Sequence, residues 1–123
     1  MRKLLPLVLP LIAAGLFYAT GLTQTLGAHP FWAQKVIWIG VGLGVPLGAI
    51  LWGLGLRKPA RLIGVAVLTL AAFATAYVGK SRFAASYAED TIAGYMWYFG
   101  WMATCVLVFA LISSAVWATR KTN

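Results

Sequence analysis

The sequence predicts an all-α integral membrane protein, built as a four-transmembrane-helix antiparallel bundle with both ends on the cytoplasmic side. Of the 123 residues, 62% are hydrophobic and 10% are charged. Soluble domains have about 45 to 50% apolar residues and about 25% charged residues. Four apolar stretches approach the length of about 20 residues that a helix needs to cross a bilayer. Basic residues cluster at the ends of these stretches, as topology signals do.

The predicted helices cover about 4–22, 35–56, 61–79 and 87–118, and residues 1–123 form a single membrane domain. Short connections favour antiparallel helices that neighbour each other in sequence order. The first helix has the charged start of a secretory signal peptide. Its apolar run of about 19 residues and the lack of a small-x-small site before a polar segment indicate a retained helix.

The second helix carries a face made for close packing. Gly40, Gly44 and Gly48 follow one another at a spacing of four, which places them along one side of a helix. Such small-residue faces let membrane helices approach closely. The third helix offers a second small-residue surface, made by Ala71, Thr75 and Gly79 at a spacing of four with Ala72 and Ala76 beside them. We expect this surface to pack against the glycine face across a tight loop.

Two prolines affect the second helix. Pro30 is expected to open it, since proline is favoured at the first helical position. Pro46 lies within the glycine segment, where it removes an N–H and crowds the carbonyl of Gly42, so we expect a kink. In transporters a broken helix marks an ion or substrate site, which is one interpretation of Pro46. The simpler interpretation is a kink that improves helix packing.

The connection before the last helix holds the only two carboxylates of the sequence, Glu89 and Asp90. Ser86 followed by Glu89 has the form of a capping box and predicts a helix start at about Tyr87. Asp90 would then lie in the first turn, where the helix dipole favours negative charge.

The basic residues predict orientation. Seven of the ten fall on one side of the predicted bundle, and Lys35, Lys80 and Arg82 fall on the other. By the positive-inside rule both termini face the cytoplasm, and we expect a bacterial inner membrane. The cluster at 57–61 is also compatible with binding of anionic lipid head groups. Nucleic acid is excluded as a partner because the charges do not line one face.

Aromatic residues concentrate in the outer half. Nine of the eleven Trp and Tyr residues fall there, although an ordinary aromatic belt populates both interfaces. Tyr95, Trp97, Tyr98 and Trp101 predict an outer-leaflet aromatic surface for a quinone, a carotenoid, a lipid tail or a partner helix. The alternative is an asymmetric belt combined with internal packing.

The residue inventory excludes several chemistries. One histidine and one cysteine rule out haem with two axial histidines, a disulfide and a Cys-based metal site within one chain. No ionisable residue lies deep in a predicted span, which is evidence against proton-coupled transport. We therefore expect no catalytic residues, no metal and no cofactor beyond the ligands named above.

These features predict a non-enzymatic accessory, assembly or stabilising subunit of a larger membrane complex. Its expected partners are the lipid bilayer and other membrane protein subunits or a second copy of itself. The alternative is a homo-oligomeric channel or carrier for a small solute, and a third interpretation is a protein that forms membrane lesions.

Overall fold

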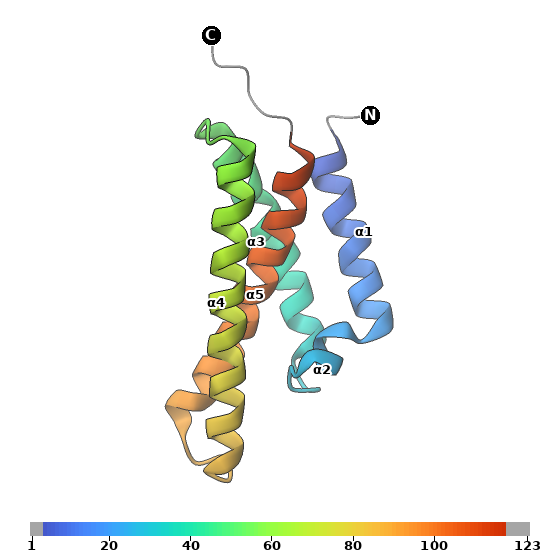
Figure 1. The fold of residues 1–123 in the computed structure, drawn as a ribbon. Coiled ribbons are helices and arrows are strands. Elements are labelled where there is room, and N and C mark those ends of the chain that lie inside the picture. The colour runs from blue at the N-terminus through green and yellow to red at the C-terminus, as the bar shows by residue number, and fades with distance from the viewer. Residues whose placement is uncertain (1–3, 118–123) are drawn as a thin grey trace.

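A computed structural model describes residues 4–117, and every regular element in that range is a helix (Figure 1). The elements are α1 (Leu5–Thr20), α2 (Leu22–Leu26), α3 (Ala33–Gly53), α4 (Lys58–Ala85) and α5 (Thr91–Val116). The four longer helices alternate in direction. One end of the molecule, here called the Arg61 end, holds the start of α1, the α3–α4 turn and the end of α5. The other, the α2 end, holds α2 and the α4–α5 turn.

Three helices, α3, α4 and α5, are long and apolar enough to cross a membrane. Helix α1 has 16 residues and is about 24 Å long at 1.5 Å per residue, less than the hydrocarbon core of about 30 Å. It ends at Gly21, whose φ of 64° is left-handed, and α2 follows. The predicted first helix at 4–22 is therefore divided, and the count of four spans remains a prediction.

Helix α5 is the centre of the fold. It packs along α4 and along α3, and more lightly against α1, which also contacts α3. Helices α3 and α4 hardly touch, and within the described residues α1 and α4 make no contact. The expected packing of the second predicted helix on the third is wrong, because each of them packs on α5 instead.

The α3–α5 seam depends on glycines. A Cβ atom built on Gly40 would lie 2.5 Å from the Cβ of Cys105, and one on Gly44 would lie 2.5 Å from the carbonyl oxygen of Val106. A Cβ on Gly48 would lie 2.9 Å from the Cβ of Ser113. Any side chain at these positions would separate the helices, so the glycine face lies directly against the backbone of α5.

The α4–α5 seam is equally close. A Cβ on Gly79 would lie 2.5 Å from the backbone nitrogen of Trp97, and one on Gly100 would lie 2.8 Å from that of Ala76. Ala76 is buried and Ala72 is half-buried in this seam. Of the predicted small-residue surface of the third helix, Ala76 and Gly79 thus face α5, whereas Ala71 and Thr75 are exposed.

The prolines have different surroundings. Helix α3 begins at Ala33, after a turn in which the N–H of Trp32 donates to the carbonyl of His29 (3.1 Å). Pro30 lies inside that turn, so the expectation that it opens the helix is wrong. Helix α3 continues through Pro46, which is exposed, as is Gly42. Within one chain Pro46 and Gly42 therefore face outward and not toward the helical interior.

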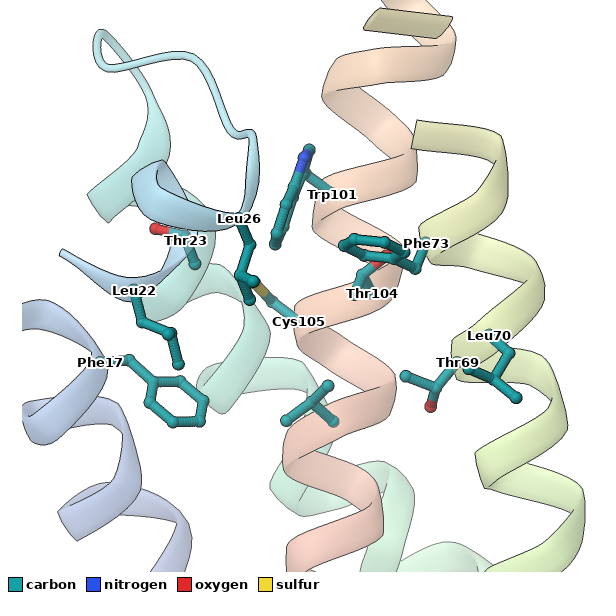
Figure 2. A pocket seen from close by; sticks show the side chains of 11 residues that line it. Phe17, Leu22, Thr23, Leu26, Thr69, Leu70, Phe73, Trp101, Thr104 and Cys105 are labelled. Carbon is teal, nitrogen blue, oxygen red and sulfur yellow. The ribbon is translucent and has the colours of Figure 1, made fainter. Parts of the chain in front are cut away.

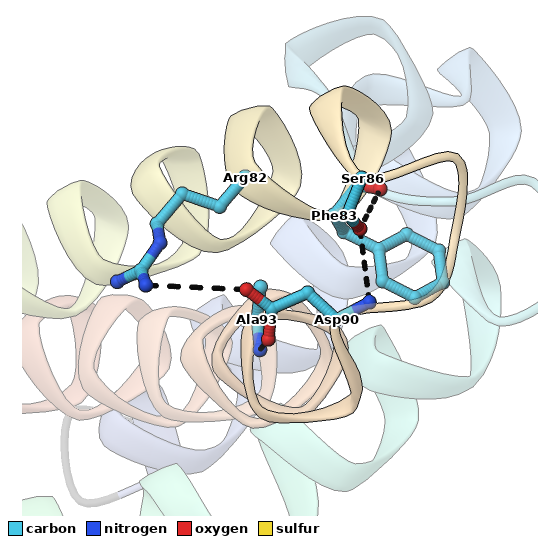
Figure 3. A network of polar contacts seen from close by, with 5 residues as sticks. All are labelled: Arg82, Phe83, Ser86, Asp90 and Ala93. Carbon is cyan, nitrogen blue, oxygen red and sulfur yellow. Dashed lines mark hydrogen bonds and ion pairs between the residues drawn. The ribbon is translucent and has the colours of Figure 1, made fainter.

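The start of α5 differs from the predicted one (Figure 3). Asp90 is the N-cap residue, and its carboxylate accepts a hydrogen bond from the N–H of Ala93 (3.0 Å). The Ser86 hydroxyl instead donates to the carbonyl of Phe83 and accepts from the N–H of Asp90, both at 2.9 Å. Tyr87 has a φ of 55°, so it cannot begin a right-handed helix. The predicted capping box of Ser86 and Glu89 is wrong.

Candidate functional site: an apolar groove and an outward helix face

Arg61 is the most deeply buried charged residue in the described chain, at 1% exposure. Its guanidinium donates to the carbonyls of Leu56 (2.9 Å), Ser114 (3.0 Å) and Trp117 (2.9 Å). Leu56 follows α3, and the other two lie in the last turn of α5 and just after it. Arg61 therefore links the start of α4, where it lies, to the segment after α3 and to the end of α5.

The electrostatics of this arrangement are favourable. The last carbonyls of a helix have no partners within it and carry partial negative charge, so a cation at a C-terminus is stabilising. The buried charge of Arg61 is therefore stabilised by backbone carbonyls and needs no carboxylate partner. The sequence assigned Arg61 to the loop charges that set orientation, since its position at the start of an apolar helix does not distinguish a buried arginine from an exposed one.

The same end holds further polar groups. Within residues 4–117, the buried side-chain atoms without a hydrogen-bond partner are Nε of Arg61, the hydroxyls of Ser113 and Ser114, and Nε1 of Trp117. Trp117 also stacks on Trp52 with ring centroids 4.2 Å apart. The interior is therefore most polar at the Arg61 end.

Trp97 connects the elements at the α2 end. Its indole N–H donates to the carbonyl of Gly27 in the α2–α3 connection (2.9 Å). Its ring centroid lies 5.3 Å from that of His29, 5.4 Å from Trp32 and 5.9 Å from Phe83 on α4. Trp97 therefore fixes the α2–α3 connection to both α4 and α5.

The four residues of the predicted aromatic surface do not share an outward face. Trp101 is only 4% exposed and meets Phe73 of α4 edge to face at 5.6 Å. Trp97 and Tyr98 are half-buried, and only Tyr95 is largely exposed. A single outer-leaflet aromatic surface is therefore the wrong description, because most of these rings pack between helices.

An apolar groove of about 260 Å³ opens between α1–α2 on one side and α4 on the other (Figure 2). It exists because α1 and α4 do not meet, and α5 forms its floor through Trp101, Thr104, Cys105 and Val108. Phe17, Leu22, Thr23 and Leu26 form one wall, and Thr69, Leu70 and Phe73 form the other. Sequence reasoning did not find this groove, since only the separation of α1 from α4 creates it.

The hydroxyls in the groove are already used. Thr23 donates to the carbonyl of Ala33 (2.8 Å), Thr69 to Val65 (2.7 Å) and Thr104 to Gly100 (2.6 Å). Hydroxyls bonded to backbone carbonyls in this way offer little polarity to a ligand. The groove is therefore suited to a hydrocarbon chain.

Helix α4 also has an outward stripe of small side chains. Its members are exposed and follow a spacing of 4, 3, 4, 3 and 4: Ala60, Gly64, Val67, Ala71, Ala74 and Val78. A Cβ on Gly64 would meet no atom within 4 Å. Bulky Ile63, Leu70 and Tyr77 run beside it at a spacing of seven. We call this set of six residues the outward stripe, and no element of the described chain covers it.

Comparison with known protein families, curated proteins and solved structures finds no match to this chain. Among the described residues, no three of the His, Cys, Asp and Glu side chains lie close enough together to hold a metal ion.

Proposed function

We propose that this protein is a non-enzymatic accessory subunit that stabilises a larger membrane complex by packing α4 against a helix of another subunit. In this proposal the chain spans a bacterial inner membrane four times, with both termini in the cytoplasm. The observation that carries it is the outward stripe on α4.

The stripe resembles the faces that α3 and α4 present to α5 inside the protein. Both seams of α5 place small residues where two backbones approach, at Gly40 and Gly44 in one and at Ala76 and Gly79 in the other. Helices gain little in lipid by covering bulky apolar side chains, because lipid tails are equally apolar, whereas small residues permit close van der Waals packing. A third such face without a partner in the chain supports docking of a further helix.

The spacing of the stripe indicates how the partner helix would lie. Alternating steps of four and three residues follow the 3.5-residue period of left-handed helix pairs. In such pairs the two helix axes cross at about 20°. The adjacent ridge of Ile63, Leu70 and Tyr77 would then enter grooves of the partner. Helix α4 has surface available for a partner helix. Only 17% of the residues in its most apolar 18-residue stretch are buried, whereas the corresponding share in α5 is 44%.

The charge distribution supports the orientation even after Arg61 is removed from the count. Arg61 is committed to helix ends inside the protein, which leaves nine basic residues. By sequence position six of these belong to the proposed cytoplasmic side, and Lys35, Lys80 and Arg82 belong to the other.

Affinity purification from the native membrane in mild detergent tests the proposal. The tagged wild-type chain should recover a stoichiometric larger membrane protein, and A71L and A74L should lose it, because leucine fills the stripe. The matched control is A103L, since Ala103 is exposed on α5 outside the stripe. Equal recovery with A71L, A74L and wild type would contradict the proposal.

The runner-up function, a homo-oligomeric channel or carrier, predicts a different result of the same purification. The chain would be recovered alone as a discrete oligomer. Since Gly42 and Pro46 are exposed, only an interface between copies can line a pore with these two residues. Solute flux in liposomes that is lost in P46A would then replace the accessory role.

A further inference from the structure

The apolar groove has a positively charged end. A small cavity of about 50 Å³ adjoins the groove at its α2 end, and Leu26, Phe73 and Trp101 line both. Lys80 and Tyr77 of α4 complete its lining together with Gly27. An ammonium group and a phenol therefore lie beside the α2 end of the apolar groove.

Lys80 extends from α4 toward the α2–α3 connection. A Cβ atom built on Gly27 would lie 3.4 Å from its Nζ, and Gly27 has a φ of 123°, which only glycine adopts readily. The indole of Trp97 holds the carbonyl of Gly27 at 2.9 Å. The backbone beside the ammonium is thus fixed, and the absence of a side chain at Gly27 lets the ammonium lie close to it.

The charge of Lys80 is not neutralised within residues 4–117. The ion pair at this end joins Arg82 to Asp90 (3.9 Å), and Glu89 makes no ion pair with Lys80. An ammonium at a membrane interface attracts anionic lipid head groups. The groove therefore offers the two complementary parts of an anionic lipid site, a cation and a hydrocarbon channel.

We propose that the groove binds one acyl chain of an anionic phospholipid, with the lipid phosphate at Lys80. The length of the groove agrees with this occupant. From Lys80 to Thr69, α4 rises about 16 Å at 1.5 Å per residue, which is close to half of a hydrocarbon core of about 30 Å. The site thus matches the depth of one leaflet, and its open side leaves the second acyl chain in the bilayer.

The chemistry distinguishes this occupant from other apolar ligands. A quinone ring inside the groove would lack donors from the three threonine hydroxyls, which are bonded to the backbone, and a quinone head group beside Lys80 is neutral and leaves the charge of Lys80 without a counter-ion. A carotenoid hydrocarbon makes no use of a cation at one end. An anionic phospholipid uses both the groove and Lys80.

Native mass spectrometry of the purified full chain tests the proposal with equimolar palmitoyl-oleoyl phosphatidylglycerol and phosphatidylcholine. The wild-type chain should retain phosphatidylglycerol with about fivefold preference, the effect of one basic residue near a membrane surface. K80Q should abolish the preference and K35Q should retain it, because Lys35 is exposed on α3 and does not line the groove.

A second pair of variants tests the hydrocarbon part. V108W fills the floor of the groove and should lower retention of both lipids at least tenfold, whereas V78W, on the outward stripe, should retain them. If circular dichroism shows that V108W does not fold, L70W replaces it as the variant that fills the groove, because Leu70 lines the α4 wall.

Three results would overturn the site: equal loss of preference in K80Q and K35Q, unchanged lipid retention when the groove is filled, or displacement of the lipid by a second copy of the chain. These readouts need no partner subunit, so the lipid site and the accessory role succeed or fail separately.

Discussion

The two faces of α4 differ in what covers them, although both carry small residues. The inward face, with Arg61, Val65, Ala76 and Gly79, is buried against α5. The outward stripe, from Ala60 to Val78, is exposed along its length. Small residues on the inward face are explained by the close approach of α5, and nothing inside the described chain gives a corresponding reason for those on the outward face.

This difference separates stability from function. Residues on the inward face hold the monomer together, so their substitution should change unfolding. Residues on the outward stripe are exposed, so their substitution should change association far more than unfolding. A lipid-facing helix has no need of a small-residue stripe, since bulky apolar side chains suit acyl tails equally well.

The largest expected effect comes from leucine at paired glycine positions on the two faces. G79L places a side chain where even a Cβ would lie 2.5 Å from the backbone of Trp97, and it should destabilise the chain by about 3 kcal/mol or more. G64L meets open space and should leave thermal unfolding in detergent unchanged. Equal destabilisation by both variants would show that the two faces do not differ as described.

A somewhat smaller effect is expected at Arg61. R61A removes three charge-assisted hydrogen bonds to helix ends and should cost about 2 to 3 kcal/mol. R57A, which removes an exposed charge from the same turn, is the control. Chemical denaturation of both variants in the same detergent measures the difference, and similar midpoints would mean that Arg61 does not join the helices.

At the α2 end of the α4–α5 seam, W97F on α5 should have a moderate effect. It keeps an aromatic ring and removes the hydrogen bond to Gly27, at a cost of about 1 kcal/mol. W38F, at a half-exposed ring on α3, should change stability less. Hydrogen exchange at residues 27–32 provides the local readout, and unchanged protection there in W97F would contradict the role of this bond.

The smallest effect on stability is expected on the outward stripe itself. A74L should shift the unfolding free energy by less than about 0.5 kcal/mol, as surface substitutions usually do. The variant should nevertheless reduce recovery of the partner complex. Destabilisation of the isolated chain by A74L would mean that the stripe belongs to the fold and not to an interface.

The sequence indicated the small-residue faces more reliably than their partners. Spacing alone puts Gly40, Gly44 and Gly48 on one side of a helix, and that side lies against α5 in the structure. Spacing does not say which helix fills the groove. The tight α3–α4 turn favoured direct pairing of α3 with α4, but both helices gain more contact by packing on α5.

Local geometry explains the other differences. The sequence predicted Ser86 as the N-cap of the last helix, but Tyr87 and Ala88 adopt positive φ and the N-cap is Asp90. Gly21 ends α1 within an apolar run that composition cannot divide. Trp101 and Arg61 have residue types that are common at membrane interfaces, and only their contacts in the fold show that both are buried.

Site-specific photo-crosslinking in the native membrane tests the central claim most directly. A photoreactive amino acid at position 71, in the middle of the outward stripe, should form one discrete adduct with a larger membrane protein. The same group at position 103, exposed on α5, should react mainly with lipid. Adducts to lipid alone at position 71, equal to those at position 103, would contradict the proposal that α4 is a docking surface for another subunit.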